Sequence, residues 1–290
     1  MKAMTPKMPR RPKIVLACIV FIGSWVFAQM GYVFFHQIQD VPADTNLFNF
    51  LKALVVDVFS NHVLLEVCLN GFILFSGIVI LRQLVHRFRY YRKWRYFMKF
   101  HSIPLLEEQL NTLFDNEKAR IRVISHPIAM AMAVGGWSPQ IILTDALVAK
   151  FNQPELESII LHEMYHCKYR HPLQIFILSI VAQSLAFLPA IKNLVHYYKI
   201  WLELLADRFV IYRTGNELLL GSVLLALFKD SKGAEQAYGV NFANEAINYR
   251  LQQLIDPQAA LKIPVIASKP LVLSLLVIII MISIIVVNCV

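Results

Sequence analysis

Long apolar stretches alternate with mixed polar segments along this 290-residue chain. Residues 14–35 and 271–287 contain no charged side chain, and residues 63–81 contain a single acid, Glu66. About 20 consecutive apolar residues cross the hydrocarbon core of a bilayer as a helix. The pattern therefore predicts three transmembrane helices. A fourth apolar stretch, residues 173–191, is interrupted by polar side chains and is considered below.

The chain between the second and third of these helices has a different pattern. Residues 104–118 carry apolar side chains at helical spacing, and the next apolar runs are too short to be more than strands. Capping and turn residues then separate a short helix from a longer one that begins near Pro154. The predicted strands are residues 120–124, 131–134 and 140–143, and the short helix is residues 145–150.

Composition and charge place these elements relative to a membrane. Hydrophobic residues make up 57% of the chain, and its mean hydropathy of +0.54 is typical of a membrane protein. Basic residues concentrate in the tail 1–13 and in residues 82–103, whereas residues 36–62 are acidic. By the positive-inside rule, we expect a cytoplasmic N-terminus, an extracytoplasmic loop 36–62 and a cytoplasmic-facing domain over residues 104–265. The C-terminus should then lie outside the cytoplasmic membrane.

The basic segment 82–103 is also rich in aromatic residues. Such a mixture fits a nucleic-acid surface, but it also fits a helix that contacts anionic lipid headgroups. Because the segment directly follows a predicted span, we interpret it as a juxtamembrane helix at the bilayer surface. We therefore expect no direct binding of nucleic acid.

The sequence His162-Glu163-Met164-Tyr165-His166 is the chemical centre of the chain. Residues four apart lie on one face of a helix, so His162 and His166 can direct two imidazoles at one zinc ion. Glu163 can then act as the base for a water on that ion. The alternative is a pair of ordinary helix histidines, which would need other polar partners in so apolar a helix. We expect Pro172 to end this helix.

A catalytic zinc ion needs a third protein ligand. The candidates after His166 are His171, His196 and Glu203. His171 is five residues further on and falls on the wrong helix face, and His196 lies in a segment that suits a membrane interface. Glu203 shares a helix face with Asp207, so the pair can supply a ligand and a hydrogen-bond acceptor for a ligand histidine. The alternative for this pair is a solvated carboxylate surface.

These motifs resemble the membrane gluzincins, and above all the M56 family of BlaR1- and MecR1-type peptidases. The resemblance covers residues 100–257 and includes the turn 135–139 and the segment 248–254. It implies zinc bound by His162, His166 and Glu203, with Glu163 as catalytic base and Asp207 in support. The fold that it implies is a mainly α membrane protein with a small α+β zincin-like (gluzincin) metalloprotease domain. The M48 peptidases (HtpX and Ste24) are similar but more distant.

The resemblance also implies a function. We expect a multi-pass protein of the cytoplasmic membrane that hydrolyses protein or peptide substrates, such as a cytoplasmic transcriptional repressor. Antibiotic-sensing M56 proteins continue into a penicillin-binding domain, whereas this sequence stops at Val290, so we expect no direct β-lactam sensing. The alternatives are membrane-protein quality control, as in M48, and a catalytically inactive signalling scaffold. Tyr238, Tyr249 and Arg250 are candidates for stabilising the oxyanion.

The implied ligand set constrains the fourth apolar stretch. Residues 173–191 are long enough to cross a bilayer, but a single crossing would separate His166 from Glu203. We therefore expect a partly embedded helix or a re-entrant hairpin that breaks at Pro189.

Overall fold

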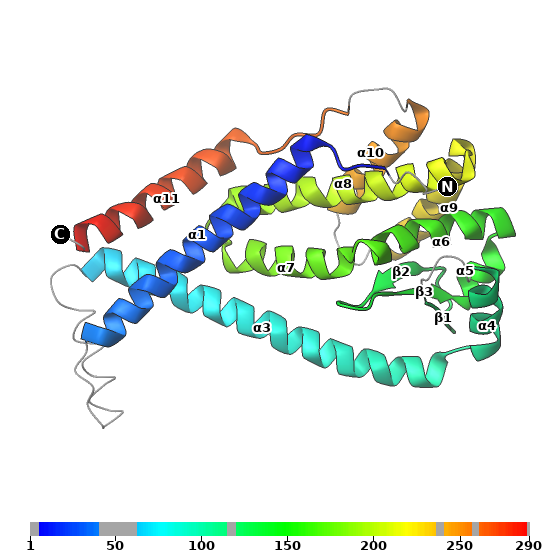
Figure 1. Cartoon of the computed structure of the whole chain (residues 1–290), viewed down its shortest axis with the longest axis horizontal. Coiled ribbons are helices and arrows are strands. Elements are labelled where there is room, and N and C mark those ends of the chain that lie inside the picture. Colours follow the sequence, from blue (N-terminus) through cyan, green and yellow to red (C-terminus); the bar gives the residue numbers. More distant parts are fainter. Residues whose placement is uncertain (1–5, 41–62, 115–119, 236–240, 257–260, 289–290) are drawn as a thin grey trace. The chain divides into compact units, whose positions relative to one another are not determined.

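The computed structural model describes residues 6–40, 63–114, 120–235, 241–256 and 261–288 (Figure 1). Its strands are β1 (Ile121–Ile124), β2 (Ala131–Val134) and β3 (Gln140–Thr144). Its helices are α1 (Arg10–Asp40), α3 (Val63–His101), α4 (Pro104–Leu113), α5 (Asp145–Lys150), α6 (Gln153–Lys168), α7 (His171–Ser184), α8 (Pro189–Thr214), α9 (Glu217–Glu235), α10 (Asn241–Ile255) and α11 (Ser268–Asn288).

The chain folds as two units. The first contains residues 1–12, 88–177 and 197–263, and the second contains residues 13–87, 178–196 and 264–290. The sheet, α6 and most of the following helices belong to the first unit. Helices α1, α3, α7 and α8 each contribute residues to both units.

The three strands form one mixed sheet in the order β1-β3-β2. Strand β1 pairs with β3 in parallel, and β2 pairs with β3 in the antiparallel sense. All three strands lie where the sequence predicts them. A bridge between Ser102 and Ile124 covers part of the outer edge of β1, whereas β2 forms the opposite edge.

Apolar side chains cover both faces of this sheet, since successive residues of a strand point to opposite faces. One face presents Val123, Ile141 and Leu143 to the large core that includes α6, and the other presents Ile124 and Ile142 to the end of α3. Two-sided burial explains why the short strands contain so few polar residues. On β2, the residues that face the large core are alanines, whose small side chains let α6 pack closely against the strand.

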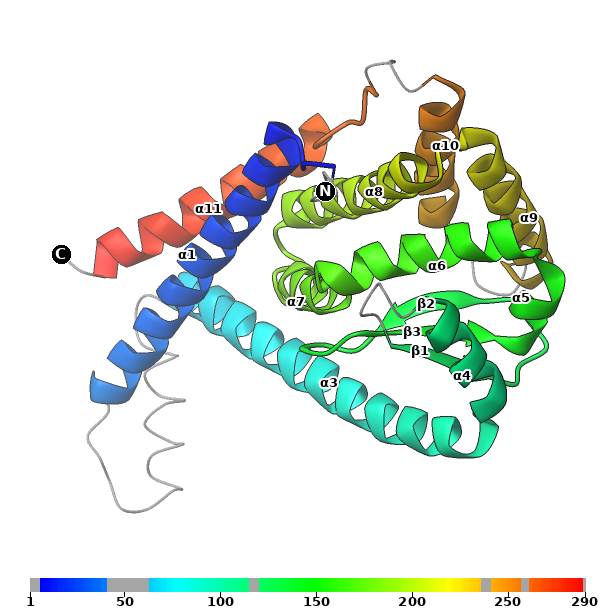
Figure 2. The same ribbon diagram turned by 45° about the vertical axis from the view of Figure 1, so that its right-hand side comes forward.

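Helix α6 lies between the sheet and α8 within the first unit (Figure 2). It packs against β2 and β3 on one side and against α9 on another, and α10 packs against α9. Most of its side chains are buried, including Ile160, Leu161 and Met164. A helix enclosed in this way holds its side chains in fixed directions, which is the requirement for a preorganised site.

The chain does not continue as expected after α6. The helix ends at Lys168, before Pro172, and Arg170 adopts a left-handed backbone conformation with φ of 54°. Helix α7 then begins at His171, so Pro172 lies in the first turn of a new helix rather than closing the old one. Helix α7 ends at Ser184 and α8 begins at Pro189, the position of the predicted break.

The second unit contains polar contacts between otherwise apolar helices. The Ser76 hydroxyl donates to the Ser184 carbonyl at 2.7 Å, and the backbone N–H of Ala190 donates to the Ser274 hydroxyl at 2.9 Å. Gln83 and Gln183 also form a hydrogen bond. These contacts connect the tip between α7 and α8 to α3 and α11 within this unit.

Two helices among the described residues are long and apolar enough to span a membrane. They comprise residues Arg10–Tyr32 and Leu69–His101, and Ser268–Ser283 is a shorter apolar helix. Large apolar side chains such as Phe21, Leu74 and Ile279 are exposed along these helices, as a lipid environment allows. These helices, together with the family identified below, indicate a membrane protein. The predicted loop 36–62 lies largely outside the described residues.

Candidate metal centre

Local sequence fixes the start of α6. The Asn152 side chain accepts a hydrogen bond from the Glu155 backbone N–H at 3.0 Å, and the Glu155 side chain accepts one from the Asn152 N–H at 3.1 Å. This reciprocal capping box satisfies two backbone donors that the first turn leaves unpaired. With its start fixed, the helix places His162 and His166 on one face, as their spacing predicts.

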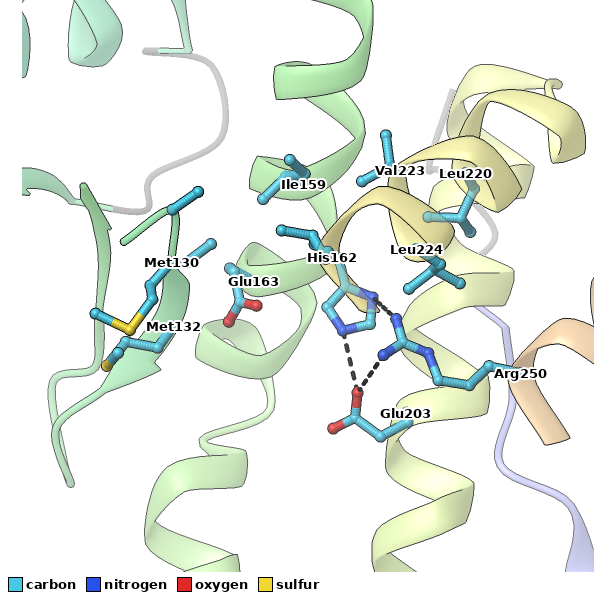
Figure 3. A pocket seen from close by; sticks show the side chains of 13 residues that line it. Met130, Met132, Ile159, His162, Glu163, Glu203, Leu220, Val223, Leu224 and Arg250 are labelled. Atoms are coloured by element: carbon cyan, nitrogen blue, oxygen red, sulfur yellow. Dashed lines mark hydrogen bonds and ion pairs between the residues drawn. The ribbon is translucent and has the colours of Figure 1, made fainter. Parts of the chain in front are cut away.

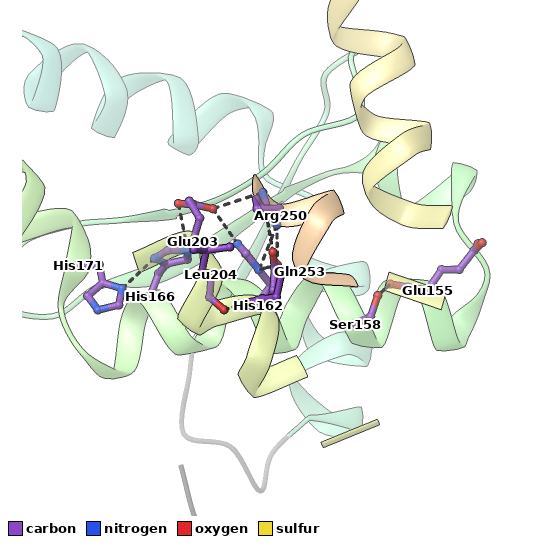
Figure 4. Close-up of polar contacts among 10 residues, drawn as sticks. Glu155, Ser158, His162, His166, His171, Glu203, Leu204, Arg250 and Gln253 are labelled. Atoms are coloured by element: carbon purple, nitrogen blue, oxygen red, sulfur yellow. Dashed lines mark hydrogen bonds and ion pairs between the residues drawn. The ribbon is translucent and has the colours of Figure 1, made fainter. Parts of the chain in front are cut away.

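Three side chains from two helices converge at this face. His162 and His166 come from α6, and Glu203 comes from the middle of α8 (Figure 4). The His162 and His166 Nε2 atoms are 3.2 Å apart. Glu203 lies 3.3 Å from the first of these nitrogens and 3.5 Å from the second, measured to its Oε2 and Oε1 atoms. One ligand atom from each residue can be chosen so that all lie within 4.8 Å of one another, so the three form a group that could hold a metal ion.

These separations are close to those of a metal site, with a different oxygen of Glu203 near each histidine. Zinc bonds of 2.0–2.1 Å to nitrogen and oxygen place neighbouring ligand atoms about 3.3 Å apart. The donors are two imidazole nitrogens and a carboxylate, a set that zinc favours. The two histidines are buried, and Glu203 is partly exposed, which leaves one side of the group accessible.

A second carboxylate lies behind the first histidine. Asp207 is one turn after Glu203 on α8 and is completely buried. The His162 Nδ1 atom donates to the Asp207 Oδ1 atom at 3.0 Å, which directs the opposite nitrogen, Nε2, at Glu203 and His166. Burial disfavours a charged His162 ring, but Asp207 and Glu203 outweigh it and raise the pKa of His162 to about 9.

Arg250 supplies the cation that balances the two carboxylates. From α10, its Nε and Nη2 atoms each donate to one oxygen of Asp207 at 2.7 Å, and its Nη1 atom lies 3.4 Å from Glu203 (Figure 4). Two-pronged pairing of this kind is strong and directional. Despite burial, Arg250 together with the histidines keeps the pKa of both Asp207 and Glu203 below the ordinary values.

A polar clamp holds α10 in the position that Arg250 needs. Gln253, one turn after Arg250, accepts a hydrogen bond from Arg208 at 2.7 Å and donates to the Leu204 carbonyl at 3.1 Å. The Arg208 guanidinium also lies over the Trp201 ring. These two hydrogen bonds, which form the Gln253 clamp, join α10 to Leu204 and Arg208 of α8, which lie before and after Asp207 in the sequence.

The Glu163 side chain extends from α6 towards β2, the edge strand of the sheet. Burial raises the pKa of the Glu163 carboxyl, and a hydrogen bond from the Ala133 backbone opposes the rise. The carboxyl group therefore lies close to the backbone of β2. Proton affinity above the ordinary value suits a group that must accept a proton and later release it.

A cavity of about 350 Å³ opens beside Glu163 (Figure 3). One side is β2 with the residues before it, and its polar end contains His162, Glu163, Glu203 and Arg250. The remaining wall is apolar and comes from α6 and α9, through Ile159, Leu220, Val223, Leu224 and Leu227. The geometry thus joins a metal-binding group and a carboxyl base to an apolar cavity.

The other candidates from the sequence have different places. His171, excluded as a ligand, nevertheless contacts His166, with their Nδ1 atoms 2.9 Å apart. His196 belongs to the second unit and is not part of the group. Of the oxyanion candidates, Arg250 lines the cavity, Tyr249 does not, and Tyr238 lies outside the described residues. The pairing of Arg250 with Asp207 is the main feature that the sequence did not reveal.

Replacing Arg250 by Met should destabilise the protein by about 3–5 kcal/mol, because the Asp207 carboxylate would stay buried without its cation. Adding Asp207→Asn should restore part of this loss, since a neutral amide needs no counter-charge. Thermal or denaturant unfolding of the purified protein measures both. The control, Arg120→Met at an exposed position, should change stability by no more than about 0.5 kcal/mol. Equal effects of the two Arg substitutions would contradict the pairing.

Comparison with known proteins identifies the family. No curated protein matches the sequence. The model of the BlaR1 peptidase M56 family matches residues 55–254, which is more than half of the chain. The matched region includes α6, all of α8 and the turn of α10 that carries Arg250 and Gln253. The chain therefore belongs to the BlaR1 peptidase M56 family.

Proposed function

We propose that the chain is a zinc-dependent membrane endopeptidase whose metal is held by His162, His166 and Glu203. The observation that carries the proposal is the convergence of three side chains: the Nε2 atoms of His162 and His166 are 3.2 Å apart, and an oxygen of Glu203 lies 3.3 Å from the first and the other oxygen 3.5 Å from the second. Membership of a peptidase family supports proteolysis and implies a metal. Zinc is the choice that suits two imidazoles and a carboxylate in tetrahedral geometry.

In this proposal Glu163 is the general base. When bound, zinc supplies a Lewis acid that polarises the scissile carbonyl and brings the deprotonation of water into the neutral pH range. Glu163 takes the proton of the attacking water and then passes it to the leaving amine nitrogen. Asp207 holds the His162 ring through its Nδ1 proton, and Arg250 holds Asp207 and Glu203.

The edge strand β2 offers a place for an extended substrate. The Thr144 N–H donates to the Met130 carbonyl, so the Met130 and Met132 backbone groups point towards β3. By alternation, the backbone groups of Ala131 and Ala133 point to the opposite edge, beside Glu163. A peptide could add to this edge by backbone hydrogen bonding, which binds many sequences and leaves selection to the side chains.

The apolar cavity supports a preference for one type of substrate side chain next to the scissile bond. Since Glu163 must reach the leaving nitrogen, the substrate residue that contributes this nitrogen lies on the Glu163 side. Ile159 is one turn before His162 on α6 and, with Val223 and Leu224 of α9, forms part of the apolar wall of the cavity (Figure 3). We therefore propose a large apolar residue directly after the cleaved bond.

For the membrane arrangement we propose three crossings, over residues 14–35, 63–81 and 271–287, with the N-terminus in the cytoplasm and the C-terminus outside. The zinc site then faces the cytoplasm, and α7 and the start of α8 enter the membrane and return as a hairpin. The contact between His166 and Glu203 supports a return, because a single crossing would place these residues on opposite sides.

The substrate role that we favour is regulated cleavage of a cytoplasmic repressor, as in BlaR1-type systems. The rival role is membrane-protein quality control. Quantitative proteomics of cells that carry active or inactive enzyme separates the two. A single cytoplasmic substrate supports regulation, whereas accumulation of many damaged membrane proteins supports quality control.

Glu163→Gln should bind zinc as the wild-type protein does but lose at least about 10²–10⁴-fold in kcat, because an amide cannot accept the proton of water. The measurement is cleavage of a quenched fluorescent peptide library by purified full-length protein, together with zinc content. Cleavage at the wild-type rate would exclude Glu163 as the base. Loss of zinc from this variant would mean that the substitution disturbs the metal site instead.

Glu203→Ala should purify with far less than one zinc ion per chain, because only two protein ligands remain. Asp207→Ala should weaken zinc binding by about 10–100-fold through the orientation of His162. Atomic absorption and chelator competition measure both effects, with His196→Ala as the control that should retain zinc. A wild-type zinc content in Glu203→Ala would rule out the proposed ligand set.

Val223→Phe should narrow the apolar cavity and shift preference towards peptides with a small residue after the cleaved bond. A change of about 10-fold in the ratio of kcat/KM for Ala and Leu substrates is expected from a loss of one to three kcal/mol for the larger side chain. Leu225→Phe is the matched control, because Leu225 is exposed on the same helix and does not line the cavity. If both variants keep the wild-type ratio, the cavity does not select this residue.

A further inference from the structure

A third histidine lies behind the candidate metal ligands. The Nδ1 atoms of His166 and His171 are 2.9 Å apart, and the two rings meet at 71° with centroids 5.0 Å apart (Figure 4). His171 is 3% exposed, so solvent water has little access to the contact between the two rings. The contact joins the last turn of α6 to the first residue of α7.

The backbone between the helices brings His171 to this position. On a continuous helix, a residue five positions after His166 would point away from it. The left-handed conformation of Arg170 interrupts the helix, and the Arg170 carbonyl accepts hydrogen bonds from the Leu173 and Gln174 N–H groups at 3.1 and 3.2 Å. The new helix therefore begins with His171 directed back at α6.

Two tyrosine rings hold the His171 ring in place. Tyr165 meets it at 63° with centroids 5.5 Å apart, and Tyr169 stacks on it at 19° with centroids 5.8 Å apart. Tyr165 is itself 3% exposed and packs against Phe209 of α8. The direction of the His171 Nδ1 atom is thus fixed by packing.

The position of the proton on each ring determines which histidine donates the hydrogen bond and which accepts it. The His166 Nε2 atom faces His162 and Glu203, at 3.2 and 3.5 Å. A nitrogen that binds a metal must present its lone pair, so the proton of neutral His166 resides on Nδ1. His166 then donates to His171, whose Nδ1 must accept and whose own proton resides on Nε2.

We propose that His171 is a positioning residue of the metal centre, which fixes the tautomer and direction of His166 by accepting its Nδ1 proton. This inference rests on the proposed metal site. Asp207 does the same for His162, but as a carboxylate that Arg250 neutralises. The two histidine ligands therefore have acceptors of different charge, one an anion and the other a neutral ring.

Two substitutions separate hydrogen bonding from packing. His171→Phe keeps a ring between the tyrosines but has no acceptor, whereas His171→Asn loses the ring and keeps an acceptor at the place of Nδ1. Zinc dissociation constants of the purified full-length protein, measured by competition with a chelator, should rise about 10–100-fold for the Phe variant. The Asn variant should stay within about threefold of wild type. The visible spectrum of bound Co²⁺ should likewise change in the Phe variant only.

The opposite order, with tighter zinc binding by the Phe variant, would show that His171 only fills space. Wild-type affinity in both variants, or equal weakening of both, would also overturn the assignment of His171 as acceptor. None of these results affects the proposed function if the wild-type protein binds zinc and Glu163→Gln abolishes cleavage. Absence of zinc binding by the wild-type protein would instead refute the proposed function, and this inference with it.

Discussion

A carboxylate removed entirely from solvent, that of Asp207, is the group on which the arrangement of the site depends. An uncompensated charge in such a place would cost several kcal/mol, so its partners are required. Arg250 satisfies both of its oxygens, and His162 adds a third hydrogen bond. Through these contacts, one buried charge fixes the direction of a candidate ligand and the position of α10 relative to α8.

The same requirement shapes the path of the chain. Candidate ligands and their partners come from α6, α8 and α10, which are separated in the sequence by α7 and by α9. Each helix has its own support: a capping box at the start of α6, the Gln253 clamp on α10 and extensive burial along α8. The site is thus placed on rigid elements rather than loops, which limits the freedom of the reacting groups.

Local pattern was sufficient to predict much of this arrangement. Helical spacing placed His162 and His166 on one face, alternation located the three strands, and Asn152 with Pro154 marked the start of α6. Residue type and spacing also selected Glu203 and Asp207, although the assignment of Glu203 as a ligand rested on the family resemblance. These features depend on interactions within a few residues or on a strict period, which a single sequence displays directly.

The remaining features depend on tertiary contacts. Asp207 and Arg250 are 43 residues apart, and no local pattern relates them. His171 was dismissed on the assumption of a continuous helix, and the assumption failed at Arg170, where the backbone turns left-handed. A non-glycine residue in that conformation is uncommon and is not signalled by its side chain. The direction expected for the His171 side chain was therefore wrong, and its 2.9 Å contact with His166 was not predicted.

Helix α8 runs without interruption from Pro189 to Thr214 and carries Glu203 and Asp207 one turn apart. The two carboxylates contact different atoms of the group: Glu203 faces the Nε2 atoms of both histidines, whereas Asp207 faces the Nδ1 atom of His162. A rotation of this part of α8 about its axis would move both carboxylates at once. The candidate ligand and the acceptor that orients His162 therefore cannot shift independently of each other.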